Sequence, residues 1–143
     1  MASQIANNWK ELLAYGTPDY DNDIFKIILM QSGFSFSRSA HEEYADVSAF
    51  ELPTAYGYTA GGSVLAGVSI VNDPVTASAQ ISWNNISWIA AGGNIQACGA
   101  IIYDDTIAAP DADPIVGFID FLSTLTTYNG GTFTIANILV AHT

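Results

Sequence analysis

The chain has 143 residues, of which 50% are hydrophobic and only 12% are charged, and its formal net charge is −11. This length and apolar content favour a single domain with a core of its own. The only strong cations are Lys10, Lys26 and Arg38. Because binding to nucleic acid or to an anionic membrane surface depends on cations, we expect neither as a partner. So few ionic groups also favour burial of part of the surface against other chains.

Cysteine content and hydropathy limit the possibilities further. The single cysteine, Cys98, can form no intrachain disulfide, and we expect a buried, unreactive thiol because no cation lies near it in the sequence. No cationic start precedes an apolar segment, and no apolar run approaches about 18 residues. We therefore expect no secretory signal and no transmembrane helix, and a protein made in the cytoplasm.

The N-terminal part of the single expected domain, residues 1–52, should contain the helices. Ser3 is the expected N-cap of a short amphipathic helix in SQIANNWKELLAY, which Gly16 and Pro18 should end. Its apolar stripe packs either on its own domain or on a neighbouring subunit. The stripe consists of Ile5, Trp9, Leu12 and Leu13.

Two more elements are expected before residue 53. The β-branched and aromatic run IFKIILM, residues 24–30, predicts a strand. Ser39 and Glu42 have the spacing of a capping box, which predicts a short helix in SAHEEYADV.

Residues 53–143 are expected to form an antiparallel β region. Five short strand-like runs, VLAGVSI, TASAQISW, QACGAIIY, IVGFIDF and TFTIANILV, are separated by NDP, NNISWIAAGGN, DDTIAAPDADP and YNGG. Alternating runs with such breaks predict hairpins, and Asn129-Gly130 is the strongest turn signal. No helical pattern lies between the runs, so the predicted fold is mainly β: an antiparallel β-sandwich or jelly-roll-like domain with short N-terminal helices.

The most glycine-dense stretch is YGYTAGGSVLAG, residues 56–67. A phosphate-binding loop would need a lysine beside its last glycine and a helix after it. Neither is present, and the spacing of Gly57, Gly61 and Gly62 fits no nucleotide-binding fingerprint. We expect Gly61 and Gly62 to turn the chain, or to form a bulge, at the entry to the first strand of the β region.

Two acidic segments are interpreted as solvated loops, with a weak structural calcium site as the alternative. In DYDND, Asp19, Asp21 and Asp23 alternate as at the start of a calcium loop, but Ile24 and Met30 replace the required Gly and Glu. The second segment holds Asp104, Asp105, Asp111 and Asp113. No metal site and no cofactor are predicted.

The sequence contains no recognisable catalytic assembly. Its only histidines are His41 and His142, and HEEYA lacks the second histidine of a zinc-protease helix. We therefore expect no enzyme. Trp83 and Trp88 could line a carbohydrate-binding face, but core or subunit packing is the favoured interpretation, and the alternation of its strand points Trp83 inward.

The order of several motifs resembles a family of small tailed-bacteriophage virion proteins. YADVSAFELPTAYGYTAGGSVLAGV is followed by a strand ending in Trp, then ACGAIIYDDT, VGFIDF and NGGTFTI, and the likeness spans roughly residues 5–138. Two segments depart from the family pattern. DFL, residues 120–122, replaces DFG, and IILM, residues 27–30, replaces an alanine-containing strand. Both are changes in packing.

The resemblance implies a structural role in the virion and no catalytic residues. The expectation is a capsid cement or decoration protein on the outside of the major capsid shell, where it stabilises adjacent capsomers and associates with itself as a trimer or dimer. The alternative is a tail or head fibre component that binds the host surface or a glycan. The expected contact residues are the helix stripe named above, Ile5, Trp9, Leu12 and Leu13, together with Tyr56 and Tyr58.

Overall fold

The computed structural model describes residues 2–143 and is mainly β, with 45% of the residues in strands and 11% in helices. All strand pairs are antiparallel, as predicted. The elements in chain order are β1 (Ala2–Ile5), α1 (Asn7–Tyr15), β2 (Phe25–Met30), α2 (Tyr44–Val47), the 3-10 helix η1 (Ser48–Phe50), β3 (Ser63–Val64), β4 (Ser69–Asp73), β5 (Ser78–Trp83), β6 (Ile86–Ile89), β7 (Ile95–Asp104), β8 (Ile115–Thr127), β9 (Thr132–Ile135) and β10 (Ile138–His142).

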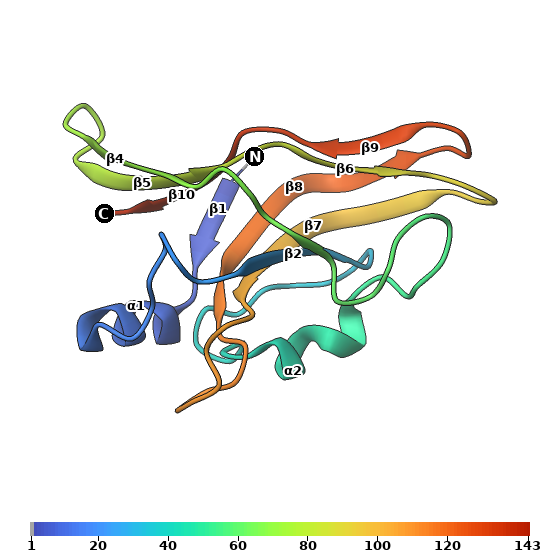
Figure 1. Ribbon diagram of the computed structural model, residues 1–143. Helices are drawn as coiled ribbons and strands as arrows, with labels where there is room; N and C mark the ends of the chain where they lie inside the picture. The colour runs from blue at the N-terminus through green and yellow to red at the C-terminus, as the bar shows by residue number, and fades with distance from the viewer. Residues whose placement is uncertain (1) are drawn as a thin grey trace.

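A five-stranded sheet in the order β1-β8-β7-β2-β3 forms the centre of the molecule. Two smaller sheets, β10-β5-β4 and β6-β9, lie across its upper face, with the helices below (Figure 1). Aromatic contacts join the layers at both ends: the rings of Phe25 and Trp83 are 5.5 Å apart, and those of Phe121 and Phe133 are 6.0 Å apart. The small sheets therefore bury one face of the central sheet.

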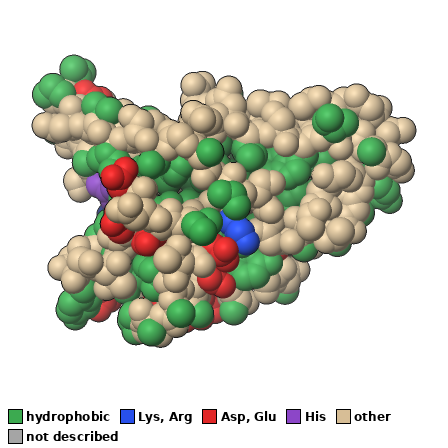
Figure 2. All heavy atoms as spheres, in the orientation of Figure 1, with side chains coloured by type: hydrophobic (Ala, Val, Ile, Leu, Met, Phe, Trp, Pro, Cys, Tyr) green, Lys and Arg blue, Asp and Glu red, His purple; other side chains and the backbone are tan. Residues whose placement is uncertain are grey.

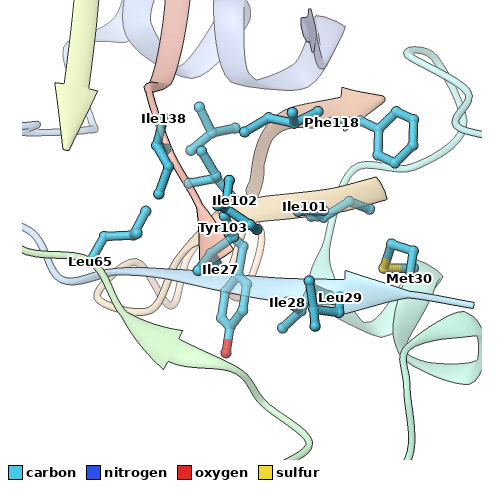
Figure 3. Packing of buried hydrophobic residues seen from close by; sticks show 14 of the residues in the cluster. Ile27, Ile28, Leu29, Met30, Leu65, Ile101, Ile102, Tyr103, Phe118 and Ile138 are labelled. Atoms are coloured by element: carbon cyan, nitrogen blue, oxygen red, sulfur yellow. The ribbon is translucent and has the colours of Figure 1, made fainter. Parts of the chain in front are cut away.

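Residues 31–62 cover part of the other face. The ring of Tyr44 stacks on that of Tyr103 at 4.9 Å, and Phe34 lies 5.5 Å from Phe118. Because both faces are covered, β2 and the second half of β7 are buried without alternation, which explains their continuous apolar runs IILM and AIIY. Figure 3 shows side chains of these two strands packed together.

The N-terminal helix begins later than predicted. Ser3 does not cap it: residues 2–5 form β1, which pairs with β8 so that Ile5 lies opposite Gly117. The helix begins at Asn7, and its N-cap residue, Ala6, supplies no side-chain hydrogen bond. The predicted end is confirmed, because Gly16 adopts φ 75° as the C-cap.

The second helix also has a different start. Glu43 and Asp46 form the capping box of α2, in place of Ser39 and Glu42. The residues before it form a turn in which His41 Nδ1 accepts the backbone N–H of Ser37 at 3.0 Å. The box spacing predicted the motif correctly but placed it four residues too early.

In the β region, the prediction missed one strand and twice merged two strands into one. VLAGVSI, residues 64–70, covers the end of β3 and the start of β4, which residues 65–68 separate and which lie in different sheets. NNISWIAAGGN contains β6, and TFTIANILV divides into β9 and β10 around Asn137, which has φ 55°. The predicted NDP hairpin is confirmed between β4 and β5. The YNGG turn is present, with Gly130 at φ 89°, but it joins β8 to β9 in another sheet and so makes no hairpin.

Candidate interaction surface

The glycine-dense stretch is held in place by a buried carboxylate. Glu51, only 4% exposed, accepts hydrogen bonds from the hydroxyls of Tyr44 and Tyr58 and from the backbone N–H of Gly61 at 2.7 Å. The Tyr58 hydroxyl also accepts the backbone N–H of Leu29 at 3.0 Å. Burial, together with the hydrogen bond to Glu51, raises the pKa of Tyr44 to about 12 and that of Tyr58 further, so both remain protonated donors.

Glycine is required where this stretch approaches other backbone. A Cβ atom on Gly62 would lie 2.0 Å from the carbonyl oxygen of Ile27, and one on Gly57 would lie 2.0 Å from that of Ile89. Gly61 and Gly62 have φ values of 94° and 77° and directly precede β3. The predicted turn at the entry to the β region is therefore confirmed.

Most of the expected contact residues are covered by the chain itself. Ile5, Trp9, Leu12 and Tyr58 are buried, and Leu13 is partly buried against the same core. The ring of Trp9 packs 6.0 Å from that of Phe25, so the α1 stripe lies on its own domain. Tyr56, by contrast, is 52% exposed. Among these six residues, Tyr56 offers the largest free apolar surface.

Charged side chains are absent from three segments of the chain that lie together in the fold. Residues 53–62, 84–98 and 121–137 contain no Asp, Glu, Lys or Arg, and we call the surface that they form the uncharged end. Several bonds bring these segments together: the N–H of Ala91 donates to Tyr56 O at 3.2 Å, and that of Gly92 to Asn129 Oδ1 at 2.9 Å. Figure 2 shows this end, on the right, without acidic or basic atoms on the visible face.

The uncharged end carries exposed apolar side chains among hydroxyls and amides. Ile89 is 65% exposed, and Ser87 and Thr134 beside it share a 2.8 Å hydrogen bond. A small hollow of about 150 Å³ opens between Tyr56 and Ile95. The exposed apolar residues of this end are Tyr56, Ile89, Leu122, Leu125 and Tyr128.

This surface was not predicted, although part of its signal is in the sequence. Residues 74–103 and 121–141 each lack any Asp, Glu, Lys or Arg. What the sequence does not give is the pairing of β6 with β9, which brings the middle of one segment against the middle of the other. Charge-free stretches point to an interface only when the topology places them together.

The acidic loops lie at the opposite, charged end. Asp19 accepts the backbone N–H groups of Asp21 and Asn22 at 3.0 and 3.3 Å, which closes a local turn. Asp105 forms an ion pair with Lys26 at 3.0 Å. Residues 2–143 contain no group of three or more His, Cys, Asp or Glu side chains that could hold a metal ion.

Asp104 differs from the other acidic residues because it is fully buried. Its Oδ1 accepts the backbone N–H of Thr106 at 2.9 Å, and its Oδ2 has no hydrogen-bond partner in the described part of the chain. Burial raises the pKa of Asp104 to about 7, and the nearby carboxyl of Asp23 adds to the rise. Asp104 therefore keeps its proton under mildly acidic conditions.

A hydrogen-bonded chain ties the C-terminal strand to α1. The indole N–H of Trp9 donates to the Tyr20 hydroxyl at 2.6 Å, and that hydroxyl lies 2.7 Å from His142 Nε2. Since an indole can only donate, the Tyr20 oxygen accepts from Trp9, and its O–H donates to His142 Nε2 in the neutral form of the imidazole that carries its proton on Nδ1. Burial lowers the pKa of His142, in keeping with this neutral form.

The residues considered for carbohydrate stacking and for thiol chemistry are largely covered. Trp83 and Trp88 are each 6% exposed, and Trp83 points inward as predicted. Cys98 is only partly buried; its Sγ donates to Gln31 O at 3.0 Å, and burial raises its pKa.

Neither the family models nor the curated proteins nor the solved structures include a match to this chain. No helix in residues 2–143 is long and apolar enough to cross a membrane.

Proposed function

We propose that the protein is a structural component of a tailed-bacteriophage virion, a cement or decoration protein on the outer surface of the capsid. It binds the major capsid protein and holds adjacent capsomers together. Part of the support is the order of motifs described above, from GYTAGG to NGGTFTI. The finer fold in this proposal is a β-sandwich or jelly-roll-like domain, which the face-to-face packing of the sheets supports.

The observation that carries the proposal is the uncharged end. A chain with a net charge of −11 repels acidic neighbours, and this repulsion is weakest at a surface that carries no charged side chains. Tyr56 and Ile89 supply apolar contacts there, and the surrounding hydroxyl and amide groups supply hydrogen bonds. In our proposal this end docks on the shell while the acidic end faces solution.

A cement protein stabilises the shell through many contacts that are individually weak. A contact of roughly 800 Å² per partner is a standard protein interface, and repetition over a shell multiplies its strength. The protein therefore needs rigid, complementary surfaces rather than reacting groups. The Glu51 network, which fixes the glycine-dense stretch beneath Tyr56, supplies that rigidity.

Virus particles that lack the chain provide the test. We expect them to assemble, to rupture at a lower temperature than complete particles, and to regain their stability when the purified chain is added. In images of complete particles, its density should lie on the head. Density on the tail, or unchanged rupture without the chain, would contradict the proposal.

A glycan-binding fibre component is the second candidate, and one hollow favours it. An opening of about 680 Å³ beside β5 and β10 is lined by Ser82, Asn84, Asn85 and Asn137, whose hydroxyl and amides suit sugar hydroxyls. Trp83 also lines it but is too deeply buried to serve as a stacking platform. Binding of the isolated chain to a glycan array would favour this candidate over the cement function.

A further inference from the structure

The β4–β5 hairpin projects from the body at the upper left of Figure 1. β4 is the last strand of the sheet β10-β5-β4 and pairs only with β5 among the described strands. Its two apolar side chains, Ile70 and Val71, are 55% and 52% exposed. Since successive side chains of a strand point to opposite faces, both faces of β4 are open to a partner.

This edge lacks the features by which proteins usually prevent edge pairing. β4 contains no lysine and no proline, and its register with β5 runs without a bulge from Ser69 opposite Ser82 to Asp73 opposite Ser78. Val75, in the turn of the hairpin, is 91% exposed. Apolar side chains gather at the tip of this projection in Figure 2.

The only charge on β4 is Asp73, and it is held within its own hairpin. Its carboxylate accepts hydrogen bonds from the backbone N–H of Val75 at 2.9 Å, from the Thr76 hydroxyl at 2.7 Å and from the Gln80 amide at 2.8 Å. These bonds lower the pKa of Asp73, with the Thr76 hydroxyl contributing most. The charge therefore stays on the carboxylate, at the end of the strand.

From these observations we infer that β4 is the site at which two copies of this chain associate, by antiparallel pairing of β4 with β4 about a two-fold axis. The two sheets then join into one of six strands. In any antiparallel register centred between Ser69 and Asn72, Asp73 faces an uncharged residue of the second copy, either Leu65, Gly67, Ser69 or Val71. Parallel pairing would set the two Asp73 carboxylates side by side, which is unfavourable.

The charge of −11 on each copy opposes self-association, so a contact between copies has to lie where charge is sparse. β4 meets this condition, because residues 52–72 contain no Asp, Glu, Lys or Arg and Asp73 is its only charged residue. Pairing at β4 leaves the uncharged end free. The inference rests on the proposed function only in that a cement protein was expected to associate with itself; it assigns the surface and the symmetry.

The test is the mass of the purified chain in solution at about 100 μM, by light scattering after gel filtration. We expect the wild type at twice 15.2 kDa and Val71→Lys at 15.2 kDa, with the same far-ultraviolet circular dichroism. Ile89→Lys is the matched control, because it adds the same charge at an exposed strand position of the other small sheet, and it should remain dimeric.

Amide hydrogen exchange tests the same contact without a substitution. Protection of residues 69–73 should rise as the wild-type protein is concentrated. A monomeric wild type, or a dimer that persists in Val71→Lys with β4 unprotected, would overturn the inference. Neither assay uses virus particles, so failure of the β4 inference leaves the capsid proposal standing. Conversely, a wild-type dimer that does not bind particles would contradict the capsid proposal and leave the β4 inference standing.

Discussion

At the scale of single residues, Tyr58 shows how the interior is fixed by hydrogen bonds as well as by packing. Its hydroxyl donates to Glu51 and accepts from the backbone of Leu29. Tyr58→Phe keeps the ring but leaves a buried N–H and one carboxylate oxygen short of a partner. We expect the free energy of unfolding to fall by about 2–4 kcal/mol, measured by urea denaturation.

Tyr103→Phe is the matched control for that substitution. It removes a single hydrogen bond, from the Tyr103 hydroxyl to the neutral carbonyl oxygen of Gly61, and keeps the stack on Tyr44. Its cost should be about 1 kcal/mol. Equal effects of the two substitutions would show that Glu51 does not depend on the buried hydroxyl in the way described.

Asp104 gives the fold a pH dependence. Its pKa rises from 3.8 in the unfolded chain to about 7 in the folded one, so the folded state binds the proton more tightly. The resulting stabilisation is complete below about pH 4 and is lost as the pH rises through 7. Asp104→Asn imitates the protonated form, so at pH 8 we expect this variant to be more stable than the wild type by about 2–4 kcal/mol.

The comparison is made by urea denaturation of both proteins between pH 4 and 8. At the acidic end their stabilities should converge, and any contribution of His142 cancels because both proteins contain it. Asp105→Asn is the control: it changes the net charge equally but breaks only the surface pair with Lys26, at a cost of about 0–1 kcal/mol. An Asp104→Asn variant that is less stable than the wild type at every pH would contradict this account.

At the scale of elements, a strand was predictable where the same kind of burial continues along its whole length. A strand whose conformation depends on pairing with a distant part of the chain was not. β2 and β7 stand out in the sequence because burial on both faces requires an unbroken apolar run. β1 was taken for helix, since four residues hold little periodic signal and their strand conformation depends on pairing with β8, more than 110 residues away. The bend at Asn137 likewise depends on which sheet each half joins.

Which of the expected contact residues are exposed was harder to predict than the strands. Spacing identified the α1 stripe as apolar, but an apolar stripe has the same pattern whether it covers its own core or a partner. Tyr56 and Tyr58 lie two residues apart, yet one is exposed and the other holds Glu51. Tyr56 and Tyr58 differ because Gly57, between them, lies against the backbone of β6. That contact is tertiary, so the local sequence does not reveal it.

The junction between the glycine-dense stretch and β2 gives a prediction at this scale. Gly62→Ala would place a Cβ atom 2.0 Å from the backbone oxygen of Ile27, and that backbone is fixed in the central sheet. We expect a loss of about 3 kcal/mol or more in the free energy of unfolding, because strain from positive φ and a clash act together.

Gly61→Ala separates these two causes. Gly61 also has positive φ, at 94°, but a Cβ atom there would meet nothing within 4 Å. Its cost should be the conformational strain alone, about 1–2 kcal/mol. If denaturation gives the two variants the same stability, the close approach to Ile27 does not determine the need for glycine.

At the scale of the whole molecule, the separation of charge is the main feature. The acidic loops and α1 lie toward one end, α2 lies below the middle of the molecule, and the strands of the uncharged end lie toward the other end (Figures 1 and 2). This separation orients the chain: the end without charge can approach another protein closely, and the acidic end remains solvated. A new charge should therefore impair binding at one end and be tolerated at the other.

Ile89→Asp and Tyr15→Asp form the pair that tests this difference. Both side chains are exposed, at 65% and 78%, so neither substitution should change the stability of the fold by more than about 0.5 kcal/mol. Ile89 lies at the uncharged end, and Tyr15 lies in α1 at the charged end. An aspartate at Ile89 would have to lose its hydration on docking, and one at Tyr15 would not.

The most direct measurement of this claim is co-sedimentation of purified chain with virus particles that lack it. Wild type and Tyr15→Asp should pellet with the particles to the same extent, and Ile89→Asp should remain in the supernatant. Equal pelleting of all three proteins, or no pelleting of the wild type, would contradict a capsid-binding role for the uncharged end.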